Sequence, residues 1–343
     1  MPTKREPLKK PAPRKKTRRR KSPVLTAETQ KVMQRLRRCV GYPVIAYWTS
    51  SGGSICQNDV MAMSHMLERD RVGQVVGLFL KSDGGNPEAA LRLVHLLRAH
   101  FRKIVLFAPF ECASAATMVA LGANEIHMGS TSYLTAVDTS LKHDLSPVDH
   151  RNYLVSVSQD EVSRILRLWR EERSGQNPYP EVYKYLHPLV IGALDRSSSL
   201  SIRICRELLA YHLKSLQKAT RISKELNSAY PSHSYPITAT EASRLGLNIR
   251  ALDGRVEELL RELNGLYSRM AQVITDDYDE MNYHNQEICN ILEREDRQVY
   301  FQVDKDWHYR KEERRWVTLN DKSSWRVAER IKGRWSNKQF FIT

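Results

Sequence analysis

The feature that most constrains the fold is an alternation of short apolar runs with helical segments between Pro43 and Gly129. The apolar runs predict four strands, at Val44–Trp48, Val75–Leu80, Ile104–Phe107 and Glu125–Met128. The segments between them predict three helices, at Asp59–Glu68, Glu88–Phe101 and Ser114–Leu121. Strand–helix–strand alternation favours right-handed crossovers between parallel strands. We therefore predict an α/β fold with a mainly parallel sheet core.

After Asp138 the pattern changes to longer helical segments. Apolar residues at helical spacing predict helices at Gln159–Arg173, Pro180–Leu194, Leu200–Leu226, Thr240–Leu245 and Gly254–Ile274. From Thr275 onward the chain becomes acidic and polar, and then rich in Trp and Arg. We expect three parts: a basic disordered tail over residues 1–24, an α/β domain followed by helices over 25–274, and an accessory module over 275–343.

The formal net charge of +15 is concentrated at the two ends of the chain. Residues 1–22 carry 11 Lys or Arg against one Glu, and residues 305–343 carry 11 against five acidic residues. The body between them is nearly neutral, which argues against a fold that coats nucleic acid. The basic ends leave two contacts open, an anionic membrane face and nucleic acid.

The five cysteines are dispersed and show no metal-ligand spacing, which fits reduced thiols in a cytoplasmic protein. We found no apolar stretch long enough for a membrane helix, and the basic N-terminus lacks the apolar segment of a secretory signal. The histidines also lack ligand spacing. We therefore expect a cytoplasmic location, with peripheral membrane contact left open, and no metal or other cofactor.

Two loops, each placed after a predicted buried strand, carry the candidate chemistry. Gly84 and Gly85 follow Val75–Leu80, and paired glycines let backbone N–H groups point into a cavity. Ser114 follows Ile104–Phe107 and opens a predicted helix, with the N–H of Ala115 beside it. A nucleophilic hydroxyl next to backbone donors would suit acyl transfer. The alternatives are an ordinary turn at the glycines and an N-cap at the serine.

The stretch Leu78–Gly129, with SDGG after one strand and ASAAT after the next, resembles the Clp protease and signal peptide peptidase group. Within this Clp/crotonase superfamily, the closest likeness is to the serine dehydrogenase proteinase family. The segments His187–Ser197 and Tyr230–Ile249 also resemble that family. The likeness covers roughly residues 43–253. It implies a Clp/crotonase-like fold, a serine hydrolase of peptidase type, and a homo-oligomer.

Carried over by position, the resemblance makes Ser114 the nucleophile and assigns the oxyanion hole to Gly84 or Gly85 together with Ala115. The His position of the Clp protease subunit falls at Asp138, and its Asp position falls beside Ser234, next to His233. An exchanged triad would use His233 as the base and Asp138 to orient it. Lys142 and Lys184 remain alternative bases, because signal peptide peptidases use Ser–Lys. Both His233 and Asp138 could instead be turn residues.

The predicted function is hydrolysis of peptide bonds in a protein or peptide substrate. One rival is a catalytically inactive scaffold that binds partners through its tails. Another is a crotonase-type enzyme that acts on a thioester without a nucleophilic serine. The aromatic and basic residues of the C-terminal module favour docking on a partner, with stacking on nucleic acid as the alternative.

Overall fold

An eleven-stranded sheet runs through both halves of the chain in the computed structural model, which describes residues 22–68, 73–138, 140–172, 177–331 and 333–342. Five strands lie parallel in the order β1-β2-β3-β5-β9. Their bounds are β1 Val44–Thr49, β2 Gly73–Lys81, β3 Phe101–Ala108, β5 Glu125–Met128 and β9 Ile249–Ala251. The protein is thus a mixed α/β structure with a parallel core, and all four strands expected between Pro43 and Gly129 are confirmed.

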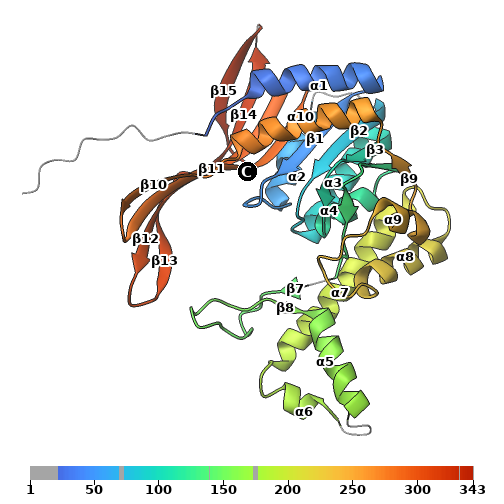
Figure 1. The fold of residues 1–343 in the computed structure, drawn as a ribbon, viewed down its shortest axis with the longest axis vertical. Coiled ribbons are helices and arrows are strands. Elements are labelled where there is room, and N and C mark those ends of the chain that lie inside the picture. The colour runs from blue at the N-terminus through green and yellow to red at the C-terminus, as the bar shows by residue number, and fades with distance from the viewer. Residues whose placement is uncertain (1–21, 69–72, 139, 173–176, 332, 343) are drawn as a thin grey trace, which may run out of the picture.

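Helices cover both faces of the parallel strands (Figure 1). One face packs against α2 Gln57–Leu67, α3 Pro87–His100, α4 Ala115–Leu121, α7 Pro188–Ala210, α8 Leu216–Ser228 and α9 Ala239–Leu245. The other packs against α1 Thr26–Val40 and α10 Gly254–Met270. Successive strand residues point to opposite faces, so Leu78 and Leu80 enter the first apolar cluster and Phe79 enters the second. This explains why the β2 sequence is apolar without alternation.

The C-terminal strands extend the same sheet in antiparallel fashion. Their bounds are β10 Ile274–Asp279, β11 Asn282–Arg294, β12 Arg297–Arg310, β13 Arg315–Asp321, β14 Ser324–Ile331 and β15 Arg334–Phe340. β11 pairs with β1, from Ala46 opposite Glu293 to Thr49 opposite Asn290. The sheet is therefore continuous across the domain boundary expected at residues 274–275. That boundary stays a prediction, as does the accessory role of residues 275–343.

Short elements complete the fold between β3 and α7. They are β4 Glu111–Cys112, β6 Tyr133–Leu134, β7 Ser140–Leu141, β8 Val157–Ser158, α5 Gln159–Glu172 and α6 Tyr179–Val182. Figure 1 shows α5 and α6 extending away from the sheet, and the long strands β10 to β13 forming a second extension.

Several of the expected helix boundaries are wrong, and α7 runs unbroken through residues 195–199, where the sequence predicts a break. The helix expected at Pro180–Leu194 is two helices, because His187 adopts an extended conformation before Pro188 and proline fits the first turn of α7. The helix expected at Leu200–Leu226 is also interrupted. Ser215 caps α8 there by accepting a hydrogen bond from the Lys218 N–H. The helix α10 ends at Met270, and Ile274 begins strand β10.

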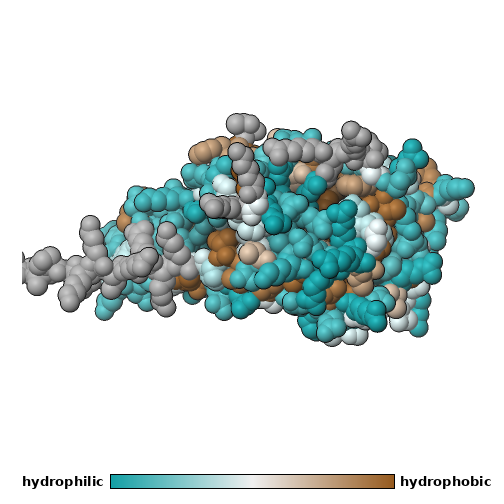
Figure 2. All heavy atoms as spheres, turned by 90° about the horizontal axis from the view of Figure 1, so that it is seen from above, coloured by the Kyte–Doolittle hydropathy of each residue, from teal (hydrophilic) through white to brown (hydrophobic). Residues whose placement is uncertain are grey.

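Most of the tail expected to be disordered, residues 1–21, lies outside the described residues. Ser22 is described and is buried, and its N–H donates to Gln286 Oε1 over 3.1 Å. No helix in the described ranges combines the length and apolar character needed to cross a bilayer. The face seen in Figure 2 is largely hydrophilic, with apolar residues gathered in separate patches.

Candidate active site

The loop after β2 is fixed by backbone hydrogen bonds to Ile55. The Ile55 N–H donates to the Gly84 carbonyl, and the Asn86 N–H donates to the Ile55 carbonyl, both over 2.8 Å. Gly84 has φ +109° and Gly85 has φ +146°, a region that residues with side chains rarely adopt. A Cβ on Gly84 would lie 2.6 Å from Ser114 Cβ. Glycine is therefore required here by its conformation and by the close approach of Ser114.

Ser114 lies immediately before α4 in a strained backbone conformation, with φ +52° and ψ −117°. Positive φ is uncommon for a residue with a side chain and is concentrated at functional sites. The helix begins at Ala115, one residue later than expected, and the Ser114 side chain makes no capping hydrogen bond. Its hydroxyl is consequently not used as an ordinary N-cap. The residue is half-buried.

Two backbone donors of these segments have no acceptor among the described residues: Ala115, which directly follows Ser114, and Gly85, in the loop whose Gly84 packs against Ser114. The Gly84 N–H donates to Ser82 Oγ over 3.1 Å, so it is already used. The N–H groups of Gly85 and Ala115 appear in none of the described hydrogen bonds. The Ala115 nitrogen lies 3.1 Å from the position that a Gly84 Cβ would take, so the helix start lies directly against the glycine loop. Of the two glycines expected as donors, Gly85 is the one with a free N–H.

The Ser114 backbone is also fixed from a third segment. Its N–H donates to Thr135 Oγ1 over 2.8 Å, and the same hydroxyl donates to the Ala136 carbonyl over 3.0 Å. Thr135 is buried. Thr135 is not among the site residues expected from the sequence. Its role in holding Ser114 could not be found from spacing, because it depends on a contact across 21 positions of the chain.

Asp138 and His233 form a hydrogen-bonded pair, with 2.7 Å between Asp138 Oδ1 and His233 Nδ1. An antiparallel bridge between Leu134 and Ile237 aligns the two segments, which brings Asp138 opposite His233. The Asp138 side chain is 10% exposed and the His233 side chain 46%. The hydrogen bond to Asp138 raises the pKa of His233, against a smaller lowering by partial burial. The pairing leaves the His233 Nε2 atom facing away from Asp138.

Thr135, which contacts Ser114, and Asp138, which pairs with His233, belong to one segment, but the pair itself makes no described hydrogen bond with Ser114. Asp138 is three positions beyond Thr135, about 10 Å in an extended chain. No hydrogen bond joins Ser114 Oγ to His233 in the described structure. His233 belongs to a loop, residues 231–236, in which every residue is exposed. The structure thus brings the predicted residues to one region without forming a complete hydrogen-bonded triad.

The two lysines considered as alternative bases lie elsewhere. Lys184 lies two residues after α6 and pairs with Glu181, with 2.6 Å between Nζ and Oε1. Lys142 follows β7 and is exposed. Neither makes a described contact with Ser114. Among the residues that the structure describes, no group of three His, Cys, Asp or Glu side chains could hold a metal ion.

Comparison with known proteins gives limited similarity. No family model matches the chain. An uncharacterised protein of Methanocaldococcus jannaschii is 24% identical over 204 residues, which are 57% of this chain and 59% of that protein. The chain thus spans less than two thirds of the length of this curated relative.

Three solved structures are similar to this chain. A mutant of the 1510-N membrane-bound stomatin-specific protease is 14% identical, over 61% of this chain and 80% of that chain, with a TM-score of 0.35. Another mutant of that protease, in complex with a substrate peptide, is 15% identical, over 61% and 75%, with a TM-score of 0.35. A ClpP1 mutant from Listeria monocytogenes is 14% identical, over 68% and 99%, with a TM-score of 0.36. The chemistry of the site therefore has to be argued from the residues of this chain.

Proposed function

We propose that this protein is a serine hydrolase that cleaves peptide bonds, with Ser114 as the nucleophile. The observation that carries the proposal is the strained Ser114 backbone beside the free N–H groups of Gly85 and Ala115. Such strain is costly, so it persists where the surroundings enforce it, as at a nucleophile held on a sharp strand-to-helix turn. The hydroxyl is uncommitted to capping and half-exposed to an incoming substrate.

In this mechanism Ser114 Oγ attacks the carbonyl carbon of the scissile bond while His233 Nε2 accepts its proton. The negative charge that develops on the carbonyl oxygen is stabilised by the Gly85 and Ala115 N–H groups. His233 then returns the proton to the leaving amine, and the C–N bond breaks to give an acyl-enzyme. Water, deprotonated by the same imidazole, releases the acid and restores Ser114. Asp138 holds the imidazole through Nδ1 and stabilises its charged form.

The mechanism requires the loop over residues 231–236 to bring His233 within about 3 Å of the Ser114 hydroxyl. All residues of this loop are exposed, so its movement does not disturb the buried core. Closure on substrate is a common way to complete a catalytic arrangement. The neighbouring bridge between Leu134 and Ile237 would anchor the loop during that movement.

The finer assignments follow from the resemblance in the sequence. They are a Clp/crotonase-like fold, membership of the serine dehydrogenase proteinase family and a homo-oligomeric state. The parallel core with a Gly-Gly loop facing a serine at a helix start supports the first of these. The cytoplasmic location is a proposal from the dispersed cysteines and the lack of a signal segment. Contacts of the basic ends with an anionic membrane face or nucleic acid remain proposals from charge alone.

A fluorophosphonate probe tests the nucleophile directly, because it reacts with activated serines and requires no knowledge of the substrate. We expect the full chain to be labelled at Ser114 and Ser114→Ala to lose labelling. Ser130→Ala is the matched control, since Ser130 is an exposed serine in a nearby loop, and it should label as the wild type does. Mass spectrometry of the labelled peptide identifies the modified residue.

Cleavage of a peptide library, read by mass spectrometry, tests the reaction class. Cleavage by the wild type that disappears in Ser114→Ala supports a peptidase. An unlabelled and inactive wild type would favour the inactive scaffold. Thioester hydrolysis that survives Ser114→Ala would favour a crotonase-type enzyme, in which the backbone donors act without the serine.

A further inference from the structure

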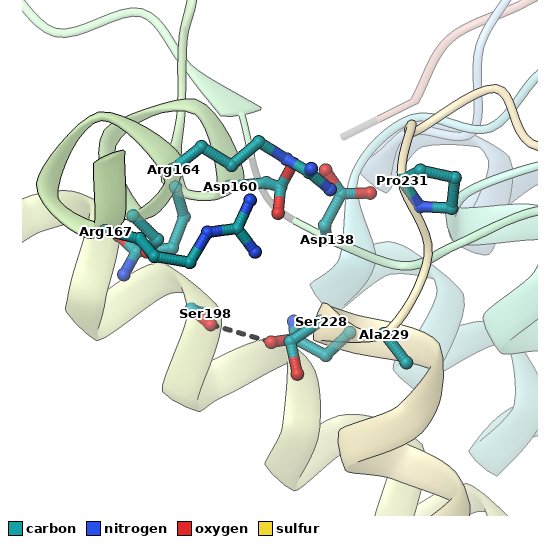
Figure 3. Close-up of a pocket in the computed structure, with 11 residues that line it drawn as sticks. Asp138, Asp160, Arg164, Arg167, Ser198, Ser228, Ala229 and Pro231 are labelled. Atoms are coloured by element: carbon teal, nitrogen blue, oxygen red, sulfur yellow. Dashed lines mark hydrogen bonds and ion pairs between the residues drawn. The ribbon is translucent and has the colours of Figure 1, made fainter. Parts of the chain in front are cut away.

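A polar cavity of about 480 Å³ adjoins the Asp138–His233 pair. It lies between α5, α7 and the segment that follows α8, and Asp138 forms part of its wall (Figure 3). Ala229 and Pro231 also line it, directly before the exposed loop that carries His233. An occupant of this cavity would therefore contact Asp138, the proposed orienting residue, and the start of the loop that carries His233.

Of the two arginines that line the cavity, Arg164 has a close ion-pair partner and Arg167 has a distant one. Figure 3 shows Arg164 and Arg167 extending from α5 into the space bounded by Asp138, Ser198 and Ser228. Asp160 is paired with Arg164, and Asp138 is paired with His233. The ion pair of Arg167 with Glu171 is long, 3.7 Å, and both side chains are more than 60% exposed. Exposed pairs of this kind contribute little, so Arg167 can exchange that partner for a ligand.

Two buried polar atoms in the cavity wall lack hydrogen-bond partners among the described residues. Asn227 is 6% exposed, and its Oδ1 accepts from Ser198 Oγ while its Nδ2 has no acceptor. Gln159 Oε1 has no donor. Both atoms are fully buried, so an occupant reaches them only when the wall rearranges, and that rearrangement would satisfy one amide donor and one acceptor.

We propose that this cavity binds a carboxylate of the peptide substrate, through the Arg167 guanidinium and the Asn227 amide. Planar guanidinium matches a carboxylate with two parallel hydrogen bonds. Gln159 Oε1 would accept a backbone N–H of the same peptide. A dianionic phosphate fits less well, because Asp138 and Asp160 lie in the same wall. This inference rests on the proposed peptidase function and specifies its substrate class.

We place the bound peptide alongside the segment from Thr135 to Asp138, and this placement sets the position of the carboxylate relative to the cleaved bond. A peptide aligned with the segment from Thr135 to Asp138 advances about 3.3 Å per residue. The cavity wall at Asp138 is three residues from Thr135, which holds the Ser114 backbone. The carboxylate therefore belongs about three residues from the scissile bond. It comes either from an Asp or Glu side chain or from the C-terminus of the peptide.

Binding to the Ser114→Ala full chain separates recognition from catalysis. Fluorescence anisotropy would compare four versions of one labelled peptide: Glu or Gln at the recognised position, each with a free or amidated C-terminus. We expect at least one carboxylate to improve affinity about tenfold or more over the uncharged version. A difference in affinity between the Glu and Gln peptides shows that the side chain is recognised. A difference between the free and the amidated peptides shows that the C-terminus is recognised.

Arg167→Gln, added to Ser114→Ala, should remove this preference by lowering the affinity of the charged peptide to that of the uncharged one. Arg170→Gln is the matched control, because Arg170 is an exposed arginine of the same helix outside the cavity. Asn227→Asp keeps the acceptor for Ser198 but replaces the donor with a negative charge, and should also abolish the preference. Thermal melting confirms that each variant is folded.

Equal affinity for charged and uncharged peptides, equal effects of Arg167→Gln and Arg170→Gln, or no peptide binding at all would overturn the proposal. These outcomes are independent of fluorophosphonate labelling. A chain that labels at Ser114 but ignores carboxylates keeps the proposed function and loses this inference. A chain that binds carboxylate peptides but is not labelled at Ser114 loses the proposed catalytic function, and the cavity is then a peptide-binding site without hydrolysis.

Discussion

The Ser114 loop and the Asp138–His233 pair are held by different means. Around Ser114 the position is set by backbone geometry, with Gly84 packed against its Cβ and a buried Thr135 accepting its N–H. His233 is joined to the structure by one side-chain hydrogen bond and sits in a loop of exposed residues. The position of Ser114 is thus fixed by buried residues, whereas the proposed base, His233, lies in an exposed loop.

This difference separates stability from activity. Changes around Ser114 disturb close packing and a strained backbone, so they should affect folding as well as hydrolysis. Changes at His233 remove an exposed side chain, so they should affect hydrolysis alone. The following variants are ordered by the size of the effect on hydrolysis.

His233→Ala should reduce kcat/KM by about 100- to 10,000-fold, the range expected for a general base. The thermal midpoint should change little, because the side chain is 46% exposed. Steady-state hydrolysis and thermal melting measure the two effects. His143→Ala serves as the control for losing a histidine outside the pair. A variant that hydrolyses as fast as the wild type would remove His233 from the mechanism and return attention to a lysine base.

Gly84→Ala should reduce hydrolysis by about 100-fold, because a shift of about 1 Å at the nucleophile has that cost. It should also destabilise the fold by about 1–3 kcal/mol, since alanine is strained at φ +109°. Gly192→Ala is the matched control, because nothing lies within 4 Å of the position its Cβ would take. Equal behaviour of the two variants in denaturant unfolding would contradict the close contact between Gly84 and Ser114.

The chain pattern predicts the parallel core because apolar runs and helical periodicity are local signals. The Gly-Gly loop and Ser114 were found by the same reasoning, since each follows a buried strand. The resemblance also placed His233 with Asp138, and their hydrogen bond is present in the structure. Whether these residues act as a triad stays a prediction.

Other features depend on contacts that are distant in the sequence. The pairing of β11 with β1 joins segments about 240 residues apart, and no local pattern identifies the partner of such a strand. The same holds for Thr135 beneath Ser114 and for the cavity between α5 and α7. The helix breaks before Pro188 and at Ser215 did have local signals, namely proline and a capping serine.

Thr135→Val should lower activity about tenfold and destabilise the fold by about 1–3 kcal/mol, because the buried Ser114 N–H loses its acceptor. Thr135→Ser keeps the hydroxyl, so it should retain most of the activity and most of the stability of the wild type. Hydrolysis and denaturant unfolding of the two variants, side by side, check the prediction. If valine and serine behave alike, the hydroxyl does not hold the Ser114 backbone.

The smallest expected effect is on pH dependence. The proposed base must be neutral, and Asp138 raises the pKa of His233, so kcat/KM should rise with pH through a value above the ordinary 6.5. Asp138→Asn should move this acidic limb toward lower pH. The pair stabilises the fold most below the unfolded pKa of histidine, and this contribution is lost as pH rises through the folded pKa. An acidic limb that does not move in Asp138→Asn would contradict their coupling.

The most direct measurement is a crystal structure of the full chain after reaction with a phosphonate probe. We predict a covalent bond to Ser114 Oγ, with the phosphonyl oxygen about 2.7–3.1 Å from the nitrogens of both Gly85 and Ala115. A phosphonyl oxygen directed into solvent, or an adduct on another residue, would contradict the account.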